Sequence, residues 1–102
     1  MLWKATPVEQ RAAVLKKAAA LMRERTESIA TLLTLEQGKV IAEARSEVLA
    51  SAQIFDWCAE EASRTYGRVL VRPTGQRAMV IKQPVGVVAA ITPWNFPNAM
   101  IT

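Results

Sequence analysis

The most constraining feature of this sequence is a short run near its C-terminal end that has no polar residue on either face. Residues 87–91 read VVAAI and follow Pro84-Val85-Gly86. A strand that is apolar on both faces is typical of a parallel sheet covered on two sides. The run therefore predicts a strand over residues 85–91 of an α/β fold. No parallel partner follows before Thr102, so we expect the domain to be truncated.

The strand leads into a turn with unusual chemistry, ITPWNFP at residues 91–97. Pro93 has no backbone N–H and should end the strand, whereas Pro97 suits the first turn of a helix. In open α/β sheets, ligands bind beyond the carboxyl ends of the strands, where Asn95 lies. Its amide could donate a hydrogen bond to an oxygen that becomes negative during a reaction. The side chain could equally cap the helix near Pro97, and local chemistry leaves both interpretations open.

Upstream of this region, apolar residues recur at helical spacing in three stretches. The first opens on a capping box in which Thr6 caps, Pro7 is the first helical residue and Glu9 returns a bond, and it runs to about residue 24. The second is capped by Thr26 and ends at Gly38, a residue that tolerates a left-handed backbone. The third spans about 40–66. Residues 68–72, 73–76 and 77–83 then predict a strand, a turn and a returning strand.

The composition of the chain argues against a metal site, nucleic-acid binding and a membrane-spanning segment. The chain has no histidine, the commonest metal ligand, and we expect no metal site. Its net charge is +4, but the basic groups are not clustered or interleaved with aromatic residues, so we expect no nucleic-acid binding. The longest apolar run is too short to span a bilayer. The single Cys58 cannot form an internal disulfide, and we expect a soluble, cytoplasmic protein.

Other residues with catalytic potential have ordinary explanations. Glu43 and Glu47 share one helix face, but Lys39 and Arg45 are near in sequence, so a solvated face is expected. Cys58 lies in mid-helix among acidic residues, unlike the electropositive setting of reactive cysteines. We expect it to be a buried or half-buried structural thiol.

Several segments together resemble one family. KQPVGVVAA, ITPWNFP and NAMIT resemble the first nucleotide-domain strand and following turn of the aldehyde dehydrogenase superfamily. ATPVEQRAAVLKKAAALMRER, LEQGKVIAEARSEV and WCAEEASRTYG resemble its helical N-terminal region in the same order. The resemblance covers essentially the whole chain and is greatest to the succinate-semialdehyde dehydrogenase branch.

The resemblance implies oxidation of an aldehyde, here succinic semialdehyde, to a carboxylic acid with NAD or NADP as hydride acceptor. A cysteine thiolate attacks the aldehyde, hydride leaves to nicotinamide, and a water activated by glutamate hydrolyses the thioester. Asn95 matches the family asparagine whose amide holds the oxyanion. The segment matching the one that lines the dinucleotide comprises Ile91, Thr92, Pro93, Trp94 and Asn95.

The resemblance also implies a division of the chain. Residues 1–67 would be the helical part of the cofactor-binding domain, and 68–84 a β-hairpin of the oligomerisation region. Residues 85–102 would hold the first strand, the turn and the helix start of a Rossmann-like nucleotide-binding domain. The intact protein would be a homo-oligomer, either a dimer or a tetramer.

The family's nucleophilic cysteine and general-base glutamate would lie beyond Thr102, so this piece alone should be inactive. The alternative from another functional class is a short non-catalytic binding or assembly protein derived from such an enzyme.

Overall fold

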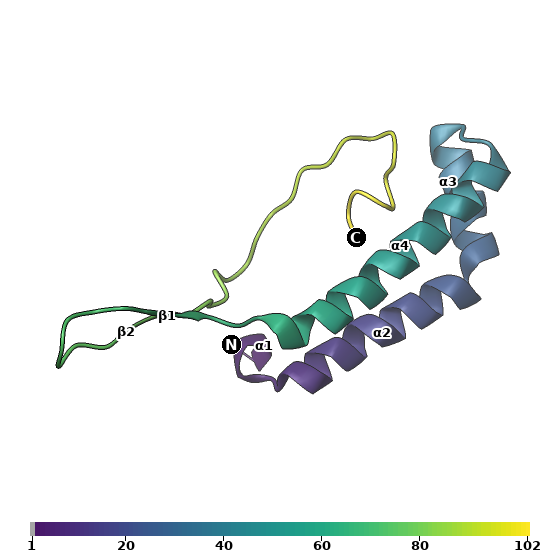
Figure 1. The fold of residues 1–102 in the computed structure, drawn as a ribbon. Coiled ribbons are helices and arrows are strands. Elements are labelled where there is room, and N and C mark those ends of the chain that lie inside the picture. The colour runs from purple at the N-terminus through teal and green to yellow at the C-terminus, as the bar shows by residue number, and fades with distance from the viewer. Residues whose placement is uncertain (1) are drawn as a thin grey trace.

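The helices and the hairpin form an elongated body (Figure 1). The computed structural model describes residues 2–102 and measures 64 × 26 × 24 Å. Its radius of gyration is 18.6 Å, against about 13 Å for a compact domain of this length. The elements are α1 (Leu2–Ala5), α2 (Val8–Glu24), α3 (Thr26–Gln37), α4 (Ile41–Glu61), the 3₁₀ turn η1 (Ala62–Arg64), β1 (Arg68–Leu70) and β2 (Ala78–Val80).

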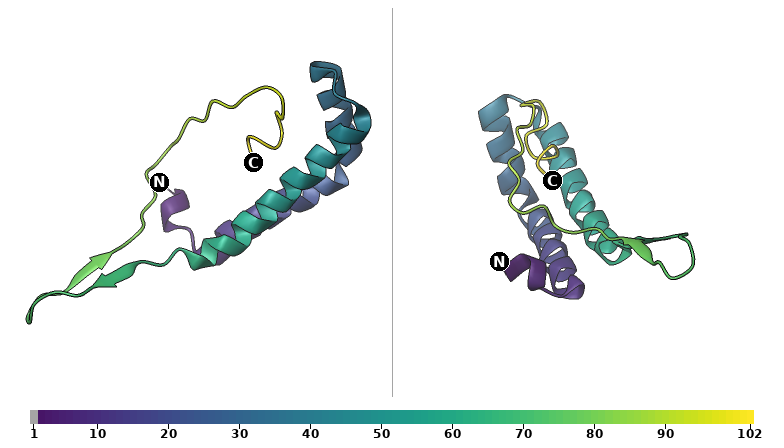
Figure 2. Two further views of the ribbon diagram at one scale, coloured as in Figure 1. Left: turned by 45° about the horizontal axis from the view of Figure 1, so that its top comes forward. Right: turned by 90° about the vertical axis from the view of Figure 1, so that its left-hand side faces the viewer.

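The helices pack through small side chains. α2 lies alongside α4, and α3 packs against the first part of α4 (Figures 1 and 2). The buried apolar residues are mostly alanines: Ala19, Ala30, Leu33, Ala44, Val48, Ala52 and Ala59. Small side chains let helix axes approach closely, and two ion pairs reinforce the contacts. Arg23 reaches Asp56 across α2 and α4 at 2.5 Å, and Arg45 reaches Glu27 across α4 and α3 at 2.8 Å.

The helix ends agree with the sequence at one position and differ at two others. Helix α2 begins at Val8, and Pro7 takes the cap position that the sequence assigned to Thr6. Gly38 has φ 80° and its N–H donates to the Thr34 carbonyl, as the left-handed stop predicts. The predicted Thr26 cap is wrong. Its hydroxyl donates backwards, to the carbonyls of Met22 at 3.1 Å and Arg23 at 2.8 Å, because α2 runs almost directly into α3. Helix α1 is an element that the sequence patterns did not predict.

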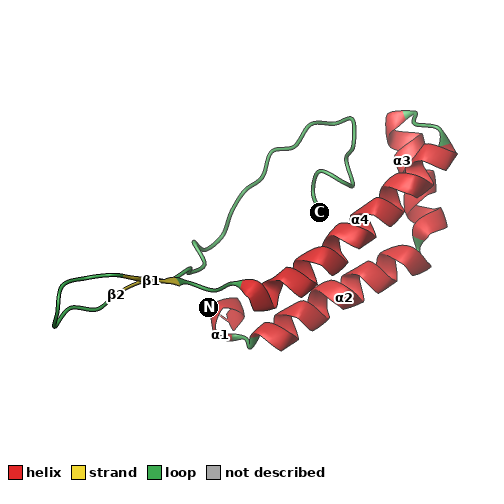
Figure 3. Ribbon diagram, viewed as in Figure 1, coloured by secondary structure: helices red, strands yellow, loops and turns green. Residues whose placement is uncertain are grey.

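The hairpin projects away from the helices (Figure 3). β1 and β2 are antiparallel with Val69 opposite Met79, which confirms the predicted hairpin with shorter strands. Gly67 precedes β1 and lies beside the last residue of β2. A Cβ atom at Gly67 would lie 2.1 Å from the Val80 carbonyl oxygen, so this position requires glycine.

The predicted strand over 85–91 does not form a ladder. Residues 81–93 have no regular secondary structure, and Val87 and Ile91 are fully exposed. A strand needs a neighbour for its backbone hydrogen bonds, and none of the described residues provides one. The segment instead runs back from the hairpin and brings the last residues against α3 and α4 (Figures 1 and 2). The helix start predicted at Pro97 is one helical turn, in which the Met100 N–H donates to the Phe96 carbonyl.

Candidate functional site

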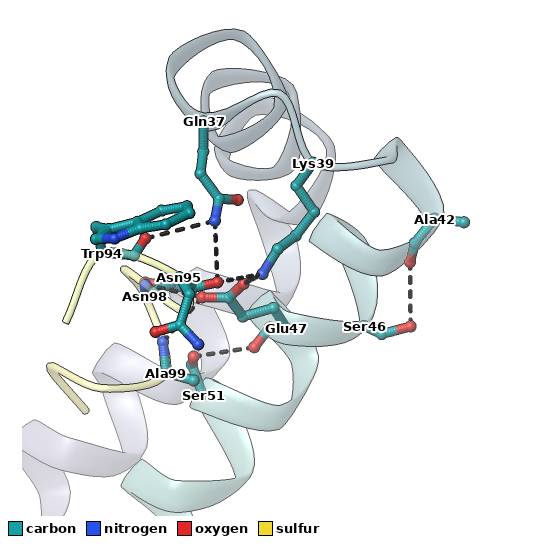
Figure 4. A network of polar contacts seen from close by, with 10 residues as sticks. All are labelled: Gln37, Lys39, Ala42, Ser46, Glu47, Ser51, Trp94, Asn95, Asn98 and Ala99. Atoms are coloured by element: carbon teal, nitrogen blue, oxygen red, sulfur yellow. Dashed lines mark hydrogen bonds and ion pairs between the residues drawn. The ribbon is translucent and has the colours of Figure 1, made fainter.

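The turn that contains Asn95 is anchored on the junction between α3 and α4 (Figure 4). Three side chains at this junction reach it. Gln37 is the last residue of α3, Lys39 lies between the helices, and Glu47 is in the second turn of α4. Their contacts are all to the backbone of the turn, except that Lys39 also pairs with Glu47 and lies over the Phe96 ring, 4.1 Å from its centroid.

Glu47 caps the helical turn that begins at Pro97. Its Oε1 atom accepts the N–H of Asn98 at 2.9 Å and that of Ala99 at 3.2 Å. These are the backbone donors that the start of a helix leaves without an internal partner. The capping interpretation of Asn95 is therefore wrong, because a carboxylate on a neighbouring helix takes that role.

Asn95 is held by its backbone. Its carbonyl oxygen accepts from Gln37 Nε2 and from Lys39 Nζ, each at 3.0 Å. Gln37 Nε2 also lies 3.4 Å from the Trp94 carbonyl oxygen. The Asn95 side chain points away from Lys39 (Figure 4), and within residues 2–102 no hydrogen bond engages its amide. The turn thus fixes the backbone of Asn95 while its side-chain donor is available.

The Lys39–Glu47 ion pair is buried, with side-chain exposures of 8% and 2%. Burial raises the pKa of Glu47, but hydrogen bonds from Lys39, Ala99 and Asn98 and the Lys39 charge outweigh it, and the pKa lies below its ordinary value. The expectation of a solvated face was wrong for Glu47, whereas Glu43 is exposed as expected. The opposing charge that makes burial of Glu47 tolerable comes from outside α4.

The proposed cofactor-lining residues, 91–94, come directly before Asn95 in the same turn. Ile91 and Trp94 are exposed by 101% and 77%, Pro93 is exposed and Thr92 is half-buried. Cys58 is partly buried, as expected. It lies eleven residues beyond Glu47 on α4, which places it about 16 Å further along the helix axis. Cys58 is therefore well removed from Glu47 along α4.

The described residues hold neither a metal-binding cluster nor a helix suited to a bilayer. Across residues 2–102, no group of three His, Cys, Asp or Glu side chains is placed to hold a metal ion. In the same range, no helix has the length and apolar character to cross a membrane.

Comparison with known proteins decides the family. A sequence model described as "Aldehyde dehydrogenase family" matches residues 1–102. The chain belongs to the aldehyde dehydrogenase family. This aldehyde dehydrogenase chain is 48% identical over 101 residues to the succinate-semialdehyde dehydrogenase [NADP(+)] GabD of Escherichia coli strain K12. It is also 48% identical over 101 residues to the glutarate-semialdehyde dehydrogenase of Pseudomonas putida strain KT2440.

The alignment covers 98% of this aldehyde dehydrogenase chain but only 21% of each of those two relatives, so the chain spans about a fifth of their length. Among solved structures, the indole-3-acetaldehyde dehydrogenase AldA of P. syringae, in complex with NAD+ and IAA, matches with a TM-score of 0.91 at 35% identity. That match covers 97% of this chain and 20% of the other. The helical layer and hairpin are therefore those of part of an aldehyde dehydrogenase.

Proposed function

We propose that residues 91–102 form part of the active site of an NAD(P)-dependent aldehyde dehydrogenase in which Asn95 donates its side-chain amide to the carbonyl oxygen of the substrate. The observation behind this proposal is that the backbone of the turn is held by hydrogen bonds, whereas the side-chain amide of Asn95 is not. Gln37 and Lys39 hold the Asn95 backbone, Glu47 caps the turn, and the Asn95 amide makes no hydrogen bond within residues 2–102.

The chemistry needs such a donor. When a nucleophile attacks an aldehyde carbon, the electron pair of the C=O bond moves to oxygen, which becomes negative. A fixed amide N–H stabilises that charge with no reorganisation at the moment of reaction. One donor of this kind contributes about 2.7–4 kcal/mol, or 10²–10³ in kcat.

The proposal also assigns cofactor binding to the residues that come directly before Asn95. Ile91, Pro93 and Trp94 are exposed directly before Asn95, and with Thr92 they would hold the dinucleotide. When bound, such a cofactor would supply the hydride acceptor that the oxidation of an aldehyde requires. The E. coli relative is named for NADP(+) and the P. syringae structure holds NAD+, and we propose that either of the two is the cofactor.

Both curated relatives are named for semialdehydes of dicarboxylic acids. We therefore propose an aldehyde with a carboxylate at its far end, succinic semialdehyde first. A homo-oligomeric, cytoplasmic enzyme is proposed with it. The exposed hairpin edge offers backbone groups for pairing with another subunit, and the free thiol of Cys58 suits a reducing compartment.

The test is Asn95→Ala in the full-length polypeptide that contains this chain. We expect kcat with succinic semialdehyde to fall about 10²–10³-fold, because the oxyanion loses a donor that acts mainly in the transition state. Gln53→Ala, which removes an exposed amide from α4, is the matched control and should leave kcat unchanged. Wild-type kcat in Asn95→Ala would exclude the proposed role.

A further inference from the structure

A buried ion pair sits directly beneath the candidate site. Lys39 and Glu47 expose only 8% and 2% of their side chains, and each also binds the backbone of the Asn95 turn. Taking two charges out of water costs free energy that their attraction often only just offsets. An apolar pair of similar volume is frequently as stable, so stability alone is a weak reason for this arrangement.

We propose that Lys39 and Glu47 are positioning residues that set the Asn95 amide in place for catalysis. This inference rests on the proposed role of Asn95. One oxygen of Glu47 accepts from Lys39, and the other accepts the N–H groups of Asn98 and Ala99. Lys39 in turn donates to the Asn95 carbonyl. The pair therefore links the backbone before Pro97 to the backbone after it.

The linkage makes the two contacts interdependent. Without Lys39, a buried carboxylate has no cation and takes up a proton or turns towards water, so the capped N–H groups lose their acceptor as well. An apolar pair could fill the space but could hold neither the carbonyl nor the N–H groups. Misplacing a reacting group by about 1 Å can cost on the order of 10²-fold in rate.

The first test is Lys39→Met in the full-length enzyme. We expect kcat to fall by about tenfold to 10²-fold with KM for aldehyde and cofactor little changed, because the loss is one of orientation. Arg45→Met is the matched control. It removes an exposed cation of α4 that pairs with Glu27 of α3, and it should leave kcat unchanged. Wild-type kcat in a folded Lys39→Met enzyme would overturn the inference.

A double-mutant cycle separates positioning from general stability. If Lys39 acts through Asn95, then adding Lys39→Met to Asn95→Ala should cause little further loss of kcat. A full additional loss in the double variant would mean that Lys39 acts on catalysis by another route, and the inference would fail. Loss of kcat in Asn95→Ala but not in Lys39→Met would reject the inference and leave the proposed function standing.

A measurement that does not depend on activity tests the linkage even if a variant is poorly active. Gln37→Met removes one donor to the Asn95 carbonyl and leaves no buried charge unpaired, so it is the milder companion of Lys39→Met. Hydrogen–deuterium exchange of peptides spanning residues 94–102 should speed up in Lys39→Met and, less, in Gln37→Met. Unchanged exchange in both variants would contradict the linkage whether or not the enzyme oxidises an aldehyde.

Discussion

At the scale of the residue, Glu47 uses its two carboxylate oxygens for different partners. Oε2 accepts from Lys39, and Oε1 accepts two backbone N–H groups of the turn. A neutral side chain could keep one acceptor, but it could not attract the lysine with the same strength. The single charge of Glu47 therefore joins three segments: the α3–α4 junction, α4 and the turn.

This charge predicts a pH dependence of stability. The pKa of Glu47 in the folded chain is below the ordinary value of 4.5, so the unfolded chain binds the proton more readily. The stabilisation is present above about pH 4.5 and is lost as the pH falls through the folded pKa. We expect Glu47→Gln to cost about 1.5–3 kcal/mol of unfolding free energy near pH 7, the usual worth of a hydrogen bond to a charged group.

The measurement is urea unfolding of this chain and its Glu47→Gln variant from pH 7 to pH 3. The two curves should converge in acid, because the wild type then carries a neutral side chain as well. Glu27, whose pKa is lowered by its hydrogen bond from Arg45, is present in both proteins and cancels in the difference. A gap between the two proteins that stays constant with pH would contradict this account of Glu47.

The sequence left two interpretations of Asn95 open, a helix cap and a donor to a substrate oxygen. Two prolines on either side of Trp94, Asn95 and Phe96 indicated a rigid turn, but not which group would cap the helix after it. Glu47 is far away in the sequence, and its burial depends on Lys39 from beyond α4. One local sign did exist, because Glu47 lies three residues from Ala44 and four from Ser51, both fully buried on α4.

At the scale of the element, local chemistry predicted most of the helices. Apolar spacing placed α2, α3 and α4, and Gly38 marked the end of α3. The strand at 85–91 was not formed, because strand formation depends on a partner and no periodicity supplies one. Thr26 failed as a cap for a related reason: the preceding helix ends so close that its carbonyls compete for the hydroxyl.

The hairpin gives a prediction at this scale. Gly67→Ala should disrupt the pairing of β1 with β2, because the new Cβ would meet the Val80 carbonyl oxygen at 2.1 Å. We expect a loss of about 1–3 kcal/mol in local stability, the usual cost of overpacking. Faster exchange of the ladder amides, those of the outer pairs Arg68 with Val80 and Leu70 with Ala78, would report it. Arg72→Ala, at an exposed position after β1, is the control, and equal exchange in the two variants would count against a close approach at Gly67.

At the scale of the whole molecule, the chain exposes far more surface than its mass requires. Its accessible surface is 8241 Å², against about 5,700 Å² for a compact monomer of 11.2 kDa. The excess is partly apolar, with Val85, Val87, Val88 and Ile91 exposed by 70–105%. An unpaired apolar segment of this kind is what a piece of a larger sheet would present. The relatives, of which the chain spans about a fifth, have the length to supply such a sheet.

A further expectation at this scale concerns which catalytic groups these residues contribute. Asn95 and the residues before it lie on one turn at the α3–α4 junction, whereas the single cysteine lies further along α4. We therefore expect these 102 residues to contribute an oxyanion donor and a cofactor-facing segment, and the nucleophile to come from outside residues 1–102.

The most direct measurement is the rate at which reduced nicotinamide forms from succinic semialdehyde, with the isolated 102-residue chain and with the full-length polypeptide that contains it. We expect turnover by the full-length protein and only the blank rate for the isolated chain. Reduced cofactor made above the blank by the isolated chain would place a nucleophile within these residues and contradict the account. So would a folded full-length protein that oxidises no aldehyde.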